Sequence, residues 1–249
     1  MIQTNVIFNE DCLEGMKKIP AGVIDAIICD LPYGTTACSW DTILPFEQLW
    51  EEYRRVIKAN GAIVLFGAEP FSTVLRSSNL KEYKYDWYWE KNTATGFAFA
   101  KYQPMRSIET ISVFSKGTAA YYPQGLVPVK QPVAKVRQAM RSDVYNSEAL
   151  SGKEYTQEYS GYPNNVLKFE KESKHCFHPT QKPVALLEYL IKTYTQKGEL
   201  VLDNCMGSGT TAIACLNTDR QFIGFETDPD YYKKSLDRIK NNRTQLALF

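Results

Sequence analysis

The sequence lacks any apolar run near the ~18 residues that a membrane-spanning helix needs. Its first residues include neither a basic segment nor an apolar stretch of the kind that forms a secretion signal, so we expect a cytoplasmic protein. A strong excess of charge is also missing, with 29 Lys and Arg against 28 Asp and Glu in 249 residues. A balanced total does not exclude a nucleic-acid partner, because the placement of basic residues matters more than their sum.

Cysteine pairs are missing as well. No C-x-x-C spacing occurs, and several cysteines lie in apolar runs, which indicates reduced, buried thiols in a cytosolic protein. The six are Cys12, Cys29, Cys38, Cys176, Cys205 and Cys215. His175, Cys176 and His178 are close in sequence, but no second cluster completes a zinc site, so we expect no metal.

Short apolar runs alternate with segments of helical periodicity along most of the chain. Strands are predicted at residues 6–8, 23–29, 62–66, 83–89, 109–114, 200–202 and 221–225, and helices at 10–19, 46–57, 70–77, 183–197, 210–217 and 229–242. Asn60-Gly61 is expected to cap the helix at 46–57, and 92–106 to form a loop rich in Gly, Ala, Thr and aromatics. This alternation predicts an α/β fold with an open, mostly parallel, Rossmann-like sheet and helices on both faces.

The composition changes after Lys116, where Tyr, Gln, Ser, Gly and Pro become frequent. We divide the chain into halves at 1–116 and 175–243, an irregular insertion at 117–174 and a tail at 244–249. Residues 116–142 contain no Asp or Glu. The basic residues there that are candidates for contacts with a nucleic acid are Lys130, Lys135, Arg137 and Arg141. The alternative is a solvated loop whose charges touch nothing.

A glycine turn follows the strand at 200–202. Asp203 ends that strand, Gly207-Ser-Gly209 turns the chain, and the next strand ends at Glu226. Glycine lets a ligand approach the backbone closely, and the helix that follows offers unpaired N–H groups. An acidic residue at the end of the second strand is placed to accept hydrogen bonds from ribose hydroxyls.

The ligand of this turn is not fixed by the pattern alone. Gly207-x-Gly209-x-x-Ala212 fits the dinucleotide fingerprint, and no Lys follows the second glycine, so it is not a Walker A loop. Asp203 would repel a pyrophosphate but suits an ammonium or a sulfonium, and S-adenosylmethionine carries both. A nicotinamide-dependent oxidoreductase stays open as the alternative.

A second candidate site is Asp30-Leu-Pro-Tyr33, at the carboxyl end of a predicted buried strand. Ligands of α/β sheets bind at such ends. Proline removes a backbone N–H, so carbonyls and the Asp30 carboxylate act as acceptors beside the aromatic face of Tyr33. An exocyclic amine on a flat base needs that set of groups, although an ordinary proline turn has the same local sequence.

The two stretches together resemble the DNA amino-methyltransferases, which transfer methyl from S-adenosylmethionine to adenine N6 or cytosine N4. Their catalytic motif is usually Asp/Asn/Ser-Pro-Pro-Tyr/Phe, and their cofactor motif reads Asp-x-Phe-x-Gly-x-Gly-Thr-Thr or similar. The catalytic motif comes first here, as in the permuted β group, and His178-Pro-Thr-Gln-Lys-Pro183 and residues 108–117 resemble segments of that group. Leu31 replaces the first Pro and Cys205 replaces the Phe. The resemblance covers nearly the whole chain except about 118–174.

The resemblance implies a site-specific DNA methyltransferase that uses S-adenosylmethionine and acts on a base flipped out of double-stranded DNA. Asp in the first motif position favours adenine N6. Cytosine N4 is the alternative target. Two other readings stay open, namely RNA as the substrate and a relative that binds nucleic acid without catalysis. Because dimers are common in the group, a homodimer is also open. The catalytic residues implied are Asp30, Pro32 and Tyr33. The cofactor-binding residues implied are Asp11, Cys12, Asp30, Thr180, Lys182, Asp203, Gly207, Ser208, Gly209, Thr210, Thr211 and Glu226. Asp11 has a simpler interpretation as a helix N-cap.

The last five residues, Gln245-Leu-Ala-Leu-Phe249, resemble the short peptide by which bacterial proteins bind the replicative sliding clamp. Packing of the same apolar side chains on the protein's own sheet is the alternative. The chain length and the lack of a nuclease-like motif suggest a stand-alone modifying enzyme, of the kind found in restriction-modification, from a bacterium or phage.

Overall fold

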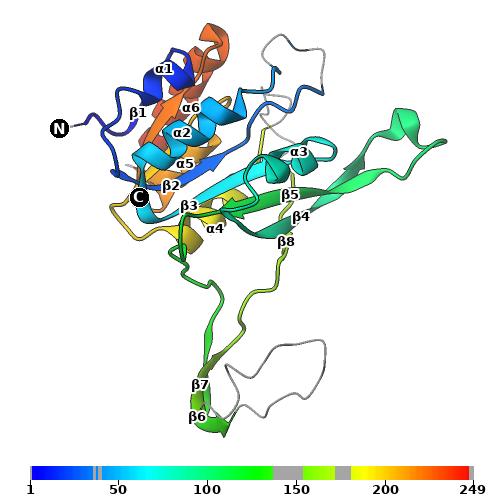
Figure 1. Ribbon diagram of the computed structural model, residues 1–249, viewed down its shortest axis with the longest axis vertical. Coiled ribbons are helices and arrows are strands. Elements are labelled where there is room, and N and C mark those ends of the chain that lie inside the picture. Colours follow the sequence, from blue (N-terminus) through cyan, green and yellow to red (C-terminus); the bar gives the residue numbers. More distant parts are fainter. Residues whose placement is uncertain (1, 36–37, 39–40, 137–153, 172–180, 247–249) are drawn as a thin grey trace. The chain divides into compact units, whose positions relative to one another are not determined.

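The computed structural model describes residues 2–35, 38, 41–136, 154–171 and 181–246. The chain forms two compact units, one of Met1–Tyr122 with Asn165–Phe249 and one of Pro123–Asn164 (Figure 1). Thr180, Arg137, Arg141, the trio His175, Cys176 and His178, and the end of the tail lie outside the described residues, as does the side chain of Lys135.

An eight-stranded sheet forms the larger unit, in the order β1-β10-β9-β2-β3-β5-β4-β8. Its strands are β1 Val6–Phe8, β2 Ile24–Cys29, β3 Ile57–Gly67, β4 Tyr83–Thr95, β5 Arg106–Phe114, β8 Val166–Lys168, β9 Leu200–Asp203 and β10 Gln221–Phe225. The five strands from β1 to β3 pair in parallel, β5 pairs antiparallel with both β3 and β4, and β8 is parallel to β4. The predicted open, mostly parallel sheet is confirmed.

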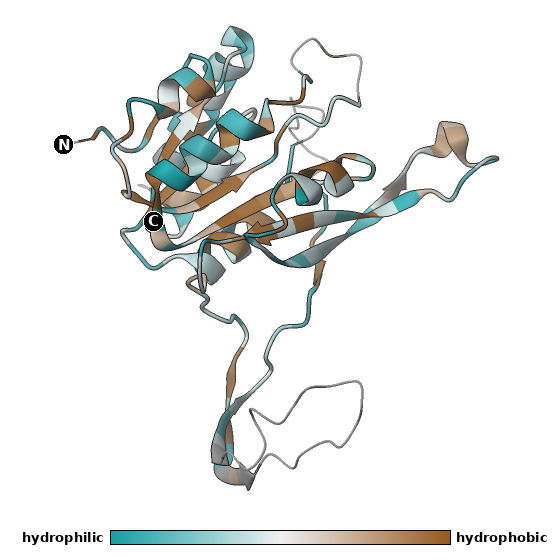
Figure 2. Cartoon of the chain, in the orientation of Figure 1, coloured by the Kyte–Doolittle hydropathy of each residue, from teal (hydrophilic) through white to brown (hydrophobic). Residues whose placement is uncertain are grey.

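Helices cover both faces of this sheet. They are α1 Cys12–Met16, α2 Phe46–Val56, α3 Phe71–Ser78, α4 Val184–Tyr194, α5 Thr210–Asn217 and α6 Pro229–Leu246. Two apolar cores result because successive strand residues point to opposite faces. Ile27 packs with side chains of α1, α2 and α3, whereas Ile28 packs with those of α4, α5 and α6. Apolar residues accordingly make up most of each central strand (Figure 2).

The structure corrects the expected helix cap at Asn60-Gly61. Helix α2 ends at Val56, and β3 begins at Ile57 and runs through both residues. Glycine is required at position 61 by packing instead, because a Cβ atom there would lie 2.4 Å from Cγ1 of Ile57 and 2.8 Å from the Asp25 carbonyl oxygen. Close packing of backbone against backbone selects glycine as firmly as a helix end does.

The expected loop at 92–106 is shorter than predicted, because β4 continues to Thr95 and β5 starts at Arg106. The two strands form a long hairpin closed by η1 Phe97–Phe99, a short 3₁₀ helix. Residues 166–168, expected to be irregular, form β8 at the edge of the main sheet.

The smaller unit contains an antiparallel pair, β6 Val127–Val136 and β7 Glu154–Ser160. A shift in their register separates Pro128 from Val133. No helix in the described part of the chain is both long and apolar enough to cross a membrane.

Candidate functional site

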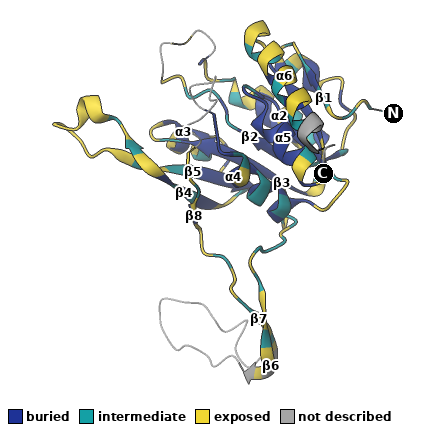
Figure 3. Ribbon diagram, turned by 180° about the vertical axis from the view of Figure 1, so that it is seen from behind, coloured by how far each residue is buried: buried dark blue, intermediate teal, exposed yellow. Residues whose placement is uncertain are grey.

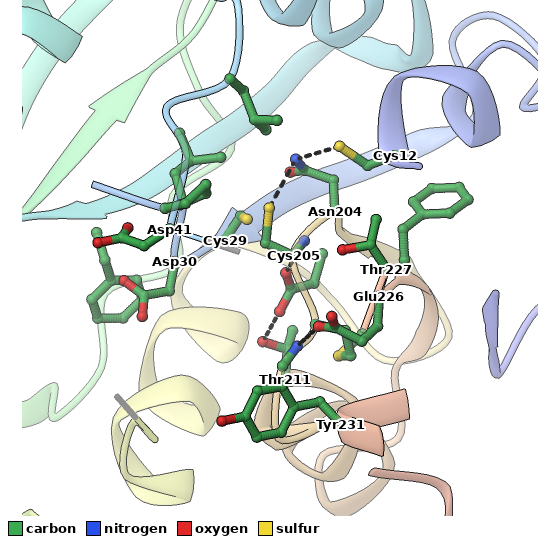
Figure 4. Close-up of a pocket in the computed structure, with 18 of the residues that line it drawn as sticks. Cys12, Cys29, Asp30, Asp41, Asn204, Cys205, Thr211, Glu226, Thr227 and Tyr231 are labelled. Atoms are coloured by element: carbon green, nitrogen blue, oxygen red, sulfur yellow. Dashed lines mark hydrogen bonds between the residues drawn. The ribbon is translucent and has the colours of Figure 1, made fainter. Parts of the chain in front are cut away.

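Three neighbouring parallel strands end at the same edge of the sheet. Asp30 follows β2, Asp203 is the last residue of β9, and Glu226 follows β10. A cavity of about 420 Å³ opens at this edge. It is lined by both sequence motifs, although more than 170 residues separate them, and Figure 4 shows Asp30 across from Thr211 and Glu226.

Most of the predicted site residues line this cavity. They are Asp11, Cys12, Asp30, Pro32, Tyr33, Lys182, Asp203, Gly207, Ser208, Thr210, Thr211 and Glu226. Gly209 is absent from the lining and instead shapes the turn, with φ of 76°. A Cβ on Gly209 would stand 3.1 Å from Cβ of Ser235 on α6, so the glycine lets that helix pack closely.

The Asp30 turn is held by hydrogen bonds on both sides. The Tyr33 hydroxyl donates to Oδ1 of Asp30 at 2.6 Å, and the Tyr33 ring stacks on Phe71 with centroids 4.8 Å apart. Asp41, which the sequence analysis did not single out, accepts from the backbone N–H groups of Gly34 and Thr35 at 2.9 Å each. Asp41 thereby fixes the backbone that follows the motif.

Lys182 lies against the Asp30 carboxylate. Its Nζ is 2.6 Å from Oδ2 of Asp30 and 3.4 Å from Oε2 of Glu109, whose other oxygen is 3.0 Å from Nζ of Lys91. Acidic and basic groups therefore alternate in a row that runs from the motif turn to the β4–β5 hairpin. The side chains of Lys182 and Lys91 are only 9% and 6% exposed, so solvent screens this network weakly.

Burial and charge act in opposite directions on the Asp30 carboxylate. Burial raises its pKa, Lys182 lowers it, and the balance leaves the pKa above the ordinary value. For Lys182, burial lowers the pKa, but Asp30 and Glu109 more than offset that effect, and its pKa lies above the usual one. Lys182 is therefore a firmly charged ammonium whose position favours the ionised form of Asp30.

Two carboxylates organise the glycine turn. Glu226 accepts from the N–H of Gly207 at 2.7 Å and from that of Asp228 at 2.8 Å. Asp203 accepts from the N–H of Cys205 at 3.1 Å and from the Thr211 hydroxyl at 2.6 Å. Burial raises the pKa of Asp203 to about 6, despite these hydrogen bonds.

Other predicted cofactor residues already have partners within the protein. Asp11 caps α1, accepting from the N–H groups of Leu13 and Glu14, as the simpler interpretation predicted. The hydroxyls of Ser208 and Thr210 lie 2.9 Å apart, and Arg238 of α6 donates to Thr210 at 2.8 Å. These contacts position the side chains at the cavity wall.

Thiols line one wall of the cavity. Asn204, another residue missed from sequence, donates to the sulfurs of Cys12 and Cys205 at 3.6 and 3.5 Å and accepts from Tyr53 at 2.5 Å. Burial raises the pKa of Cys29 to about 12, so that thiol stays protonated. Cys205, in the place of the usual Phe, is thus part of a packed polar contact rather than a void.

Known proteins resemble the chain over most of its length. The DNA adenine methyltransferase YhdJ of Escherichia coli K12 is 29% identical, with 95% of this chain and 83% of that enzyme aligned. The type II methyltransferase M.HpaI of Haemophilus parainfluenzae is 28% identical over 92% of this chain and 72% of the relative.

Solved structures share the fold. The crystal structure of the M1.HpyAVI–SAM complex matches with a TM-score of 0.63 at 24% identity, covering 96% of this chain and all of that one. The cytosine-N4-specific PvuII DNA methyltransferase matches with a TM-score of 0.65 at 16% identity, over 98% and 93% of the two chains. A model of the DNA methylase family N6_N4_Mtase matches residues 24–237, and the chain therefore belongs to this family of DNA methylases.

Proposed function

We propose that the protein transfers a methyl group from S-adenosylmethionine to N6 of adenine in DNA. The observation that carries this proposal is the single cavity lined by both the Asp30 turn and the Gly207 turn. A hydride-transferring enzyme would have no use for an acceptor-rich Asp-x-Pro-Tyr turn there. The relatives named above as adenine and type II methyltransferases support the same conclusion.

The groups that line the cavity fit S-adenosylmethionine. The volume of the cavity lies within the ~300–1,000 Å³ that is usual for small-molecule sites. Asp203 would hold the ammonium of the methionine part, and Glu226 would accept hydrogen bonds from the ribose hydroxyls. When bound, this cofactor supplies an electrophilic methyl group on a sulfonium.

Lys182 needs a revised role in this proposal. The family resemblance implied that Lys182 binds the cofactor, yet its ammonium lies 2.6 Å from Asp30. We assign it to Asp30, which it keeps ionised and fixed in place. The positive charge beside the cavity is then largely neutralised by Asp30 and Glu109.

The target base must leave the duplex to reach Asp30, at a cost of a few kcal/mol. Asp30 and a backbone carbonyl near Leu31 or Pro32 would accept its two N–H bonds and so orient the nitrogen lone pair. Phe71 stacks on the Tyr33 ring, so the base would stack on the face of that ring which Phe71 does not cover. Methylation makes the amine acidic, and the ionised Asp30 can accept the proton that it releases.

The nucleoside product tests the proposed function. Unmethylated genomic DNA is incubated with the protein and S-adenosylmethionine, digested, and its nucleosides are separated. N6-methyladenine is expected. N4-methylcytosine would move the assignment to the other branch of the family, methylated RNA in a parallel reaction would change the substrate class, and the absence of every methylated nucleoside would contradict the proposal.

Cofactor affinity is expected to rise about tenfold between about pH 5 and pH 7. The reason is that Asp203, with a pKa of about 6, must lose its proton to pair with an ammonium that stays charged up to about pH 8. Titration calorimetry across this range measures it. Asp203→Asn is the control, since it should bind weakly and without this rise; an unchanged pH dependence in that variant would assign the effect to another group.

The basic stretch of the smaller unit is expected to bind DNA phosphates. Lys130, exposed on β6, is the described residue that tests this. Lys130→Ala should weaken DNA binding and reduce the slope of log affinity against log salt by about one. Lys81→Ala, an exposed lysine of the larger unit, is the matched control. Equal slopes for both variants would leave the stretch as a solvated loop.

Clamp binding by Gln245–Phe249 and a homodimer stay predictions.

A further inference from the structure

The tip of the β4–β5 hairpin presents large apolar side chains to solvent. Phe97 is 80% exposed, Phe99 57% and Tyr102 87%. The hairpin runs well beyond the rest of the sheet, and the short helix η1 at its tip is coloured hydrophobic in Figure 2 and exposed in Figure 3. Single exposed apolar residues are common on proteins, but a contiguous group of aromatics marks an interaction surface.

The tip has a defined backbone conformation. Gly96 adopts φ of 94° and starts the 3₁₀ turn. The N–H groups of Phe99, Ala100 and Tyr102 then donate to the carbonyls of Gly96, Phe97 and Phe99 at 3.0, 3.0 and 2.9 Å. The aromatic rings are therefore carried on a built turn, which lowers the entropy that a partner would have to overcome on binding.

Strand polarity places this tip at the edge of the sheet that holds the cavity. Asp30 follows β2, and the parallel β3 ends beside it, with Cys29 paired to Leu65. Because β5 is antiparallel to β3, with Gly67 opposite Thr110, residues before Thr110 continue past that same edge.

The base of the hairpin is also joined to the Asp30 turn by charge. Glu109 of β5 lies 3.4 Å from the Lys182 ammonium that contacts Asp30, and Lys91 of β4 lies 3.0 Å from Glu109. A macromolecule that brings a base to Asp30 therefore approaches the edge from which the hairpin projects.

The charge of the hairpin fits a polyanion. Residues 92–108 contain Lys101 and Arg106 and no Asp or Glu. Lys101 and Arg106 are exposed near the aromatic tip. Aromatic rings beside cationic side chains are the combination that binds nucleic-acid bases and backbone together.

We propose that the hairpin tip, residues 96–105, enters the DNA duplex next to the target base and stacks Phe97 or Tyr102 on the bases that the extruded nucleotide leaves behind. This inference rests on the proposed function and adds the surface that opens the duplex. Stacking of a base on an aromatic ring is worth roughly 5- to 150-fold in affinity, which offsets much of the cost of extruding the target base.

The test compares two substrates for the full-length protein. The methylated site is first found by sequencing genomic DNA that the wild-type protein has modified. Two duplexes carrying that site are then made, one fully paired and one with an abasic position opposite the target base. The double variant F97A/Y102A is expected to lose at least tenfold in kcat/KM on the paired duplex. On the abasic duplex, where the target base is already unpaired, the loss should stay within about threefold.

Leu80→Ala is the matched control, because Leu80 is 68% exposed but precedes the start of β4, at the opposite end of the same hairpin strand. It should match the wild type on both duplexes. Cofactor affinity, measured by calorimetry, should be the same in all variants.

Three outcomes would overturn the inference alone while the wild type still methylates DNA. One is wild-type kcat/KM of the double variant on the paired duplex. Another is an equal loss on both duplexes, which would mean that the tip does not assist extrusion. The third is a change in oligomeric state with unchanged kinetics, which would make the tip a contact between copies of the chain. Absence of any methylation by the wild type would instead overturn the proposed function, and this inference with it.

Discussion

Asp30→Ala should lower the rate of methyl transfer by at least about 10³-fold, because the variant loses both the charge and the acceptor oxygens of the side chain. A methyl side chain can neither accept the N–H bonds of the base nor take up the proton that the methylated amine releases. Removing one preorganised electrostatic contact from an active site costs about 10²–10³ in turnover, and Asp30 supplies two such functions. Single-turnover transfer of a radiolabelled methyl group to DNA measures the rate.

The variant should still fold, because Lys182 keeps Glu109 as a partner at 3.4 Å. Cofactor affinity should change far less than the rate, since Asp203 and Glu226 belong to the other turn. Thermal unfolding and calorimetry check both points. Asp30→Ala with near-normal turnover would remove Asp30 from the mechanism, and a variant that fails to fold would be replaced by Asp30→Glu, which keeps the charge but displaces it.

Sequence patterns predicted the parallel part of the sheet well. The strands β2, β9 and β10 are mostly buried on both faces, so they are nearly continuous apolar runs, and an acidic residue lies at or directly after the end of each. Both ligand-facing turns follow directly from these ends. The glycine turn and α5, at Thr210–Asn217, could therefore be located from sequence alone.

Contacts between distant segments could not be predicted in the same way. Asp41 accepts hydrogen bonds from the backbone that follows the Asp30 turn, and no periodic pattern links the two. Glu109 contacts Lys91 because antiparallel pairing places β5 beside β4. It contacts Lys182 because the segment directly before α4 passes close to β5. For the same reason Lys182 was assigned from sequence to the cofactor, whereas its nearest partner in the fold is the Asp30 carboxylate.

Lys182→Met is expected to lower turnover at neutral pH by about 100-fold and to shift the rise of activity with pH to more alkaline values. Burial already raises the pKa of Asp30, and Lys182 is the largest influence that lowers it. Without the ammonium, Asp30 and Glu109 are two carboxylates that repel each other, so the pKa of Asp30 rises further and a smaller fraction is ionised at neutral pH. The measurement is kcat as a function of pH in wild type and variant.

Stability should respond to the same substitution with a defined sign. Removing one partner of a buried ion pair costs about 3–5 kcal/mol in the free energy of unfolding. Since the variant's folded state raises the pKa of Asp30 above its unfolded value, that state binds more protons, and its stability falls as pH rises through the folded pKa. The loss relative to wild type should accordingly be larger at alkaline than at acidic pH in urea unfolding.

Lys182→Arg keeps the charge and should recover most of the stability and the pH profile, whereas Lys91→Met leaves the Asp30 contact intact and should shift the profile less. A Lys182→Met enzyme with the wild-type pH profile would show that the ammonium does not control Asp30.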